Sequence, residues 1–155
     1  GDLPDSSLQA IRVGQVRRVI VATPQYLKGA PPLNAAADLL QHSIVAASGV
    51  TPTPEWRLMQ DGEPVSIKLQ PRMLTTSNDS AIQACLQHFG LTRLLSYQVA
   101  DLVREGRLHT LLSDAEPAPL PVHVVHREGR YASKKTRAFI DLAVERLRAH
   151  PALGL

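Results

Sequence analysis

The chain has 155 residues, of which 44% are apolar, with a formal net charge of +3 and one cysteine. This length and composition suit one domain or two small lobes around a buried core, and they exclude a disordered chain. No apolar run approaches the roughly 18 residues of a membrane span. A single cysteine excludes an internal disulfide framework and a cysteine-built zinc site. We expect a soluble, intracellular α/β protein.

The basic pI of 9.4 comes from one segment of the chain. Residues 127–150 hold seven basic side chains and three acidic ones, whereas the rest of the sequence is close to neutral. Such a segment is typical of a solvated helix face, and a nucleic-acid footprint is the alternative. Aromatic residues make up only 4% of the chain, so few rings are available to stack on single-stranded nucleic acid.

In chain order, the first predicted element is a buried strand at residues 16–22, because the run is β-branched and ends at Pro24. A helix capped by Asn34 is expected at residues 34–42. A strand at residues 43–47 follows, and then a loop rich in glycine and proline.

A β-hairpin is predicted around Asp61-Gly62, a dipeptide favoured in two-residue turns, with strands at residues 55–60 and 64–70. Residues 73–75 are expected to be extended. The polar segment at residues 76–79 then opens a helix that Gly90 closes. Its apolar stripe is spaced for one buried face and comprises Ile82, Cys85, Leu86 and Phe89.

The C-terminal half continues the alternation of strands and helices. It predicts strands at residues 91–96, 107–112 and 120–126, a helix at residues 97–105, and a last helix at residues 134–149. Ser133 is the expected cap of that last helix, whose buried stripe is predicted to include Phe139 and Ile140. The alternation implies an α/β fold with a mostly parallel sheet that helices cover on both faces.

Enzyme motifs are absent from the sequence. Neither glycine-rich phosphate-binding pattern occurs, and no Gly-x-Ser-x-Gly elbow positions a nucleophile. His123 and His126 are three positions apart on a predicted strand, which places them on opposite faces and argues against a shared metal. Cys85 falls in an apolar helix stripe, where a thiol is usually buried and inert. We therefore predict a protein that is not an enzyme and uses no cofactor or metal.

Two polar segments at strand ends are candidates for binding a ligand. Ser48 and Gly49 follow one predicted strand, and Ser77 and Asn78 lie at a helix start, where unpaired backbone N–H groups favour an anion. Ligands of open α/β sheets bind outside the carboxyl ends of the strands, and both segments fit that position. The alternative is that Ser77 or Asn78 only caps its helix and that Gly49 only forms a turn.

An ordered series of short motifs runs through the whole sequence. It begins with Gly1-x-Leu3-Pro4-Asp5-Ser6-Ser7-Leu8 and with Val19-Ile20-Val21-Ala22-Thr23-Pro24-Gln25-Tyr26-Leu27. It continues with Asp38-Leu39-x-x-His42, Trp56, Asn78-Asp79, Gly106-Arg107-Leu108, Pro121-Val122-His123-Val124-Val125 and Arg137-Ala138-Phe139-Ile140-Asp141. In this order the motifs resemble the effector-binding domain of a LysR-type transcriptional regulator.

The resemblance implies a periplasmic-binding-protein-like fold, with two α/β lobes and a small effector held between them. Residues 1–21 would end the first lobe and form the crossover, and residues 22–126 would form a mostly complete second lobe. Residues 127–155 would return to the first lobe with the C-terminal helix. The family's N-terminal helix-turn-helix and the first half of its first lobe are not represented, so we interpret the chain as a fragment of a longer protein.

The resemblance also implies which residues bind the effector. In the second lobe these are Ala47, Ser48, Gly49, Ser77 and Asn78. In the first lobe it is Arg12, whose guanidinium could pair with a carboxylate. The alternative is that Arg12 is an ordinary arginine on the surface of its lobe.

The implied function is the sensing of a small, anionic metabolite by a cytoplasmic regulator that forms a homo-oligomer, a dimer or a tetramer. The helix from Asn78 to Phe89 is a candidate contact between subunits. Promoter DNA would be bound only through the missing N-terminal domain, and this chain would bind DNA weakly, without sequence preference. The alternatives are a lobe of a solute-binding protein for transport and an α/β enzyme, which has only the fold in its favour.

Overall fold

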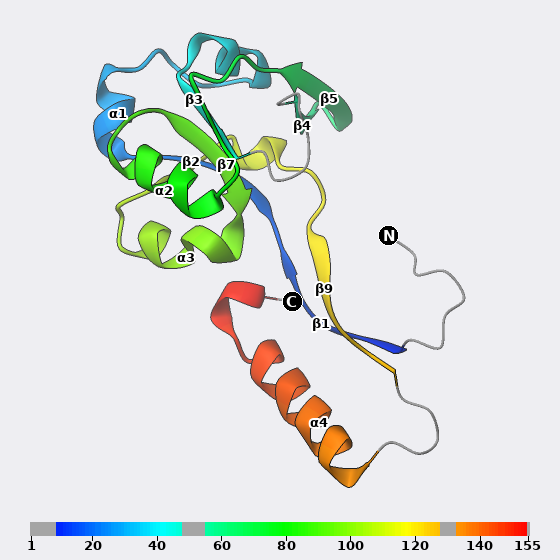
Figure 1. Ribbon diagram of the computed structural model, residues 1–155. Helices are drawn as coiled ribbons and strands as arrows, with labels where there is room; N and C mark the ends of the chain where they lie inside the picture. Colours follow the sequence, from blue (N-terminus) through cyan, green and yellow to red (C-terminus); the bar gives the residue numbers. More distant parts are fainter. Residues whose placement is uncertain (1–8, 48–54, 128–132, 155) are drawn as a thin grey trace. The chain divides into compact units, whose positions relative to one another are not determined.

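The computed structural model describes residues 9–47, 55–127 and 133–154 (Figure 1). The chain divides into two compact units. One unit is formed by Arg17–Ala118 and is called the central unit below. The other is formed by Gly1–Val16 together with Pro119–Leu155 and is called the terminal unit. No helix in the described part of the chain is long and apolar enough to cross a membrane.

The central unit contains a five-stranded sheet (Figure 1). Its strands lie in the order β6, β3, β7, β2, β8, and they comprise Met73–Thr75, Ile44–Ala47, Leu91–Leu95, Arg18–Ala22 and His109–Leu111. β3 is parallel to β6 and β7, whereas β2 is antiparallel to β7 and β8. The prediction of a mostly parallel sheet is therefore wrong for both ladders of β2. The crossover through helix α3 (Ser96–Arg104) joins β7 to β8, and β2 is inserted between them.

Both faces of this sheet are buried, which explains why β2 is apolar at every position after Arg18. Val19 and Val21 pack on one face with residues of helices α2 (Asn78–Leu86) and α3. Ile20 and Ala22 point to the other face. That face is covered by the hairpin of β4 (Glu55–Gln60) and β5 (Glu63–Lys68) and by the 3₁₀ helix η1 (Ala36–Gln41).

The predicted hairpin is confirmed, with Gln60 opposite Glu63. Asp61 and Gly62 both have positive φ angles, 52° and 82°, which is the geometry of a type I′ turn. The short helix α1 (Pro24–Gly29) was not predicted. Pro24 ends the strand as expected, but it also occupies the first turn of α1, and the Thr23 hydroxyl caps that helix by accepting from the Tyr26 N–H.

The predicted helix before β7 is shorter in the structure. α2 begins at Asn78 and ends at Leu86, so Phe89 lies beyond the helix and is exposed, contrary to the predicted stripe. His88 has a positive φ of 60° and takes the role expected of Gly90. Gly90 serves a different purpose, because a Cβ there would clash with the carbonyl oxygen of Ser43.

The predicted helix at residues 34–42 is a 3₁₀ helix, η1, and Asn34 does not cap it. Instead, the Asp38 carboxylate accepts hydrogen bonds from the backbone N–H groups of Asn34 and Ala35, each at 2.9 Å. These two bonds lower the pKa of Asp38 below its usual value. The cap therefore comes from a side chain inside the helix, a possibility that the sequence pattern alone did not distinguish.

The described residues of the terminal unit form an antiparallel ribbon and two helical segments. β1 (Gln9–Val16) pairs with β9 (Leu120–His126), and the register shifts between Arg12 and Gly14. β1 was not predicted, because its polar and glycine positions hide the apolar alternation. Gly14 is required there, since a Cβ would clash with the carbonyl oxygen of Leu153 in the 3₁₀ helix η3 (Pro151–Leu153).

Helix α4 (Lys134–Arg148) confirms the last predicted helix and its cap, because the Ser133 hydroxyl accepts from the Thr136 N–H. Arg148 ties the helix to β1 by donating from Nε and Nη2 to the Arg12 carbonyl oxygen, at 3.3 Å and 3.0 Å. The predicted stripe is only partly correct. Ile140 is buried, whereas Phe139 is 72% exposed.

Candidate ligand-binding site

The strands of the central unit bring several chain segments to one edge of the sheet. β3, β6 and β7 are parallel, so their carboxyl ends meet there, and Ala47 is paired with Thr75. β2 runs in the opposite direction, so its first residue, Arg18, reaches the same edge and lies opposite Leu95. This edge is where ligands bind in open α/β sheets.

The predicted site residues are distributed as follows. Ala47 ends β3 and is half-buried, and Ser77 and Asn78 open α2 after β6. Ser48 and Gly49 lie outside the described residues. Arg12 belongs to the terminal unit, where it is exposed and its Nη2 donates to Gln15 Oε1 at 3.1 Å.

Ser77 and Asn78 have different roles in the structure. The Ser77 hydroxyl accepts from the Ser80 N–H at 3.3 Å, so Ser77 caps α2. This is the role that the alternative interpretation of Ser77 predicted. Asn78 is exposed at the first position of the helix and lines a cavity. Of the predicted residues, Asn78 lines the smaller of the two cavities described here.

That cavity has a volume of about 170 Å³ and lies within the central unit. Strands β2 and β7 and the first turns of α2 and α3 form its wall. Its lining residues are Arg18, Asn78, Arg93, Leu94, Leu95 and Gln98. Sequence analysis missed Arg18, Arg93 and Gln98, although the two arginines gave a signal. Each is a charged residue in a predicted strand that is otherwise mostly apolar.

The two arginines lie on the same face of the sheet. Arg93 is opposite Ile20, and Arg18 is two residues before Ile20 on the same strand, so the arginines are diagonal neighbours. Arg93 donates from Nη1 to the Arg57 carbonyl oxygen at 3.0 Å, and its Cζ is 5.2 Å from the ring centroid of Trp56. Burial, with the nearby charge of Arg18, lowers the pKa of Arg93 to about 10, which leaves the Arg93 side chain cationic at neutral pH.

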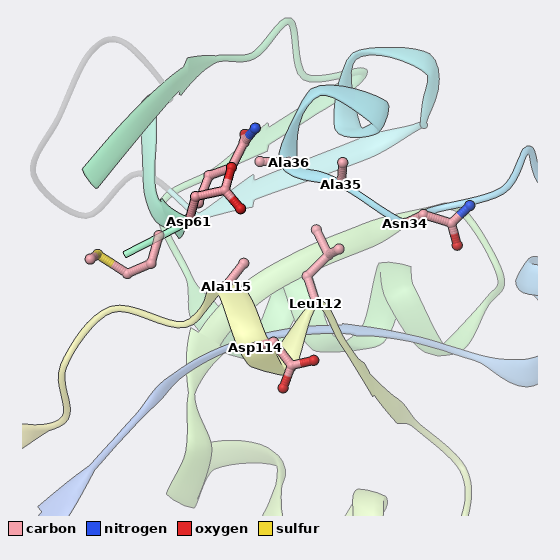
Figure 2. Close-up of a pocket in the computed structure, with 9 residues that line it drawn as sticks. Asn34, Ala35, Ala36, Asp61, Leu112, Asp114 and Ala115 are labelled. Atoms are coloured by element: carbon pink, nitrogen blue, oxygen red, sulfur yellow. The ribbon is translucent and has the colours of Figure 1, made fainter. Parts of the chain in front are cut away.

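A second cavity of about 370 Å³ lies between η1, the hairpin turn and the 3₁₀ helix η2 (Ser113–Ala115) (Figure 2). Figure 2 shows the side chains of Leu112 and Ala115 pointing toward this space, whereas the Asp114 carboxylate points away from it. The charged residues that line it, Asp61 and Asp114, are both acidic. The described residues contain no group of three or more His, Cys, Asp or Glu side chains that could hold a metal ion.

Cys85 behaves as the sequence predicted. It is buried in α2, and its Sγ donates to the Val21 carbonyl oxygen at 3.6 Å. Burial raises the pKa of this thiol to about 11, so the thiolate is scarce at neutral pH. The half-buried Tyr26 and the buried His42 are structural in the same sense, because the Tyr26 hydroxyl contacts His42 Nδ1 and accepts from the Ser43 N–H, both at 3.1 Å.

The fold defines an α/β regulatory domain of the two-lobed, periplasmic-binding-protein-like class. The profile of the family described as "LysR substrate binding domain" matches residues 1–148. Because this match covers nearly the whole sequence, the chain belongs to the LysR substrate-binding domain family.

Individual relatives support this assignment. The chain is 27% identical over 147 residues to the HTH-type transcriptional regulator PtxR of Pseudomonas aeruginosa, covering 95% of this chain and 47% of that protein. The regulatory domain of AphB from Vibrio vulnificus superposes with a TM-score of 0.81 at 26% identity, covering 92% of this chain and 71% of that one.

The regulatory domain of CrgA, a LysR-type regulator from Neisseria meningitidis, superposes with a TM-score of 0.77 at 26% identity. This similarity covers 95% of this chain and 72% of that one. The chain spans about half the length of the curated relatives it matches.

Proposed function

We propose that this chain senses a small-molecule effector and passes that signal to transcription as the regulatory part of a cytoplasmic, DNA-binding regulator. The match of residues 1–148 to the LysR substrate-binding domain family carries this proposal. The matched relatives are named as HTH-type transcriptional regulators, which favours a regulator over a transport lobe or an enzyme.

We infer that the effector binds at the edge of the central sheet where β3, β6 and β7 end. The proposed contacts in the central unit are Ala47, Ser48, Gly49, Ser77 and Asn78. Arg12, which belongs to the terminal unit, stays a prediction of the sequence analysis. The observation that supports this position is the cavity lined by Asn78 at that edge. Ser77 contributes by holding the first turn of α2, because its hydroxyl is already engaged as the cap.

DNA binding and oligomerisation belong to the same proposal. The acidic Asp141 and Glu145 interrupt the basic residues of α4, which do not form one continuous cationic face. We expect this chain to bind DNA only weakly, by attraction to phosphates, with promoter recognition located elsewhere in the regulator. We also expect the regulator to form a homo-oligomer.

The experiment that tests the effector site is a titration of the chain with a panel of neutral, anionic and cationic metabolites. Amide resonances of a ¹⁵N-labelled sample report where each ligand binds. We expect at least one metabolite to shift the resonances of Ala47 and Asn78. Shifts confined to Asp61 and its neighbours would instead place the ligand in the larger acidic cavity and contradict the proposed site.

A further inference from the structure

We propose that Arg18 and Arg93 form an anion subsite that recognises the oxyanion of a small molecule, a carboxylate or a phosphate, in the 170 Å³ cavity of the central unit. This inference rests on the proposed function, because it names the class of ligand that the effector site takes. It adds two residues that neither the sequence motifs nor the family match assigned.

The first argument is the absence of a counter-charge. The ion pairs within the described residues use Arg17, Arg104 and Arg107, and neither Arg18 nor Arg93 takes part in them. Two like charges on one face of neighbouring strands repel each other. Partial burial increases that cost, because it removes water that would otherwise screen the charges. A bound anion would relieve both effects.

The second argument is the composition of the cavity wall. No acidic side chain lines it. Arginine offers only hydrogen-bond donors, and the planar guanidinium matches a carboxylate or phosphate with two parallel bonds. Gln98 also presents hydrogen-bond donors to the cavity. Its Oε1 accepts from the Leu95 N–H at 3.0 Å, which leaves its amide N–H groups for a ligand.

The third argument is that the site is preorganised. Arg93 is fixed from two directions, since Nη1 donates to the Arg57 carbonyl oxygen and the guanidinium lies over the Trp56 ring. Its Nε and Nη2 have no hydrogen-bond partner among the described residues. A side chain held in this way loses little rotamer freedom when it binds a ligand, so more of the interaction energy appears as affinity.

The volume of the cavity limits the size of the ligand. A cavity of about 150 Å³ is known to hold a molecule the size of benzene, and this one has about 170 Å³. It therefore accommodates a single oxyanion attached to a small body. Leu94 and Leu95 give that body an apolar contact.

The test uses two simple probes, sodium acetate for the carboxylate and inorganic phosphate for the phosphate, at constant ionic strength maintained with chloride. The side-chain Nε–H resonances of arginine report binding directly. We expect one or both probes to shift the resonances of Arg18 and Arg93, and whichever probe binds more tightly identifies the oxyanion.

Variants make the test specific. Arg18→Gln removes one charge without disturbing the Trp56 contact, and we expect it to weaken probe binding at least tenfold. Arg93→Lys keeps the charge but loses the planar fork, and we expect a similar loss. Arg104→Gln is the matched control, because Arg104 is exposed and pairs with Asp101 away from the cavity. Its affinity for the probe should be unchanged. Thermal unfolding of each variant confirms that it is folded.

The outcomes separate this inference from the proposed function. Failure of both probes to shift the two arginines, or unchanged probe affinity in Arg18→Gln and Arg93→Lys, overturns the anion subsite. If a neutral metabolite then shifts the amide resonance of Asn78, the proposed effector site stands and only the proposed class of ligand is wrong. If no metabolite of the panel binds anywhere on the chain, the sensing function itself is overturned.

Discussion

The two units of the chain bury their apolar side chains to very different degrees. The central unit has a sheet with a packed cluster on each face, and most of its core side chains are fully buried. In the terminal unit, α4 buries only Ile140 among its described residues, while Phe139 and Leu142 are 72% and 51% exposed. The apolar stripe of α4 therefore contributes less to stability than the buried stripes of α2 and α3 in the central unit. The difference arises because fewer side chains pack against α4.

The sharpest way to test this difference is to truncate one apolar side chain in each unit. Ile44→Ala creates a cavity beside Leu91 in the central core and should lower the free energy of unfolding by about 2–5 kcal/mol. Phe139→Ala, the matched change on α4, should lower it by about 0.5 kcal/mol or less, because the ring is exposed. Urea unfolding of the chain measures both values. Equal losses would show that Phe139 is buried in solution.

Each unit also contains a glycine that lies against a backbone carbonyl oxygen, and replacing each with alanine compares the two units again, with a smaller expected loss of stability. Gly90→Ala introduces a Cβ against the Ser43 carbonyl oxygen, between strands β3 and β7, and should cost about 1–3 kcal/mol by overpacking. Gly14→Ala meets the Leu153 carbonyl oxygen in η3, a 3₁₀ helix of three residues, which can shift more readily than a strand of the central sheet. Thermal unfolding should therefore show the smaller loss for Gly14→Ala. The reverse order would mean that η3 is the more rigid of the two contacts.

The smallest expected effect concerns charge. Burial raises the pKa of Glu116 above its usual 4.5, and the ion pair with Arg17 at 3.0 Å only partly opposes this shift. The folded state therefore binds more protons than the unfolded state just above pH 4.5. The contribution of Glu116 to stability falls as pH rises through that window.

Glu116→Gln should remove this dependence, so its free energy of unfolding relative to the unsubstituted chain should rise between pH 4 and pH 6. Glu63→Gln, which removes one carboxylate from the exposed hairpin, is the matched control. Urea unfolding of both variants and of the unsubstituted chain across this pH range measures the effect. A constant difference between Glu116→Gln and the unsubstituted chain would refute the raised pKa.

The sequence predicted local structure well where one short-range signal dominates. Asp61-Gly62 specified the hairpin, and Ser77 and Ser133 specified two helix starts, because each choice is made within four residues. It failed where tertiary contacts decide. The sequence pattern assigned Gly90 to the end of a helix, whereas the structure requires glycine there because the Ser43 carbonyl oxygen lies too close for a Cβ. The position of β2 between β7 and β8 likewise depends on pairing between distant segments.

The lining of the 170 Å³ cavity could be predicted from the sequence only in part. Asn78 was identified because it opens a helix after a strand, a pattern that is visible in sequence. Arg18 and Arg93 were not, because their proximity follows from the antiparallel register of β2 and β7, in which Ile20 lies opposite Arg93. A pair of diagonal neighbours becomes visible only when the register is known.

The terminal unit is built from two segments, Gly1–Val16 and Pro119–Leu155, that are far apart in the sequence. This separation affects the order in which the chain can fold. Its ribbon pairs Gln9 with His126, so β1 has to wait during synthesis until β9 has been made. The central unit contains all its own strands and can form first. Once it has formed, Arg17 and Glu116 hold its two ends together at 3.0 Å. The long loop between β1 and β9 is then already closed, and the ribbon forms without the entropy cost of closing it.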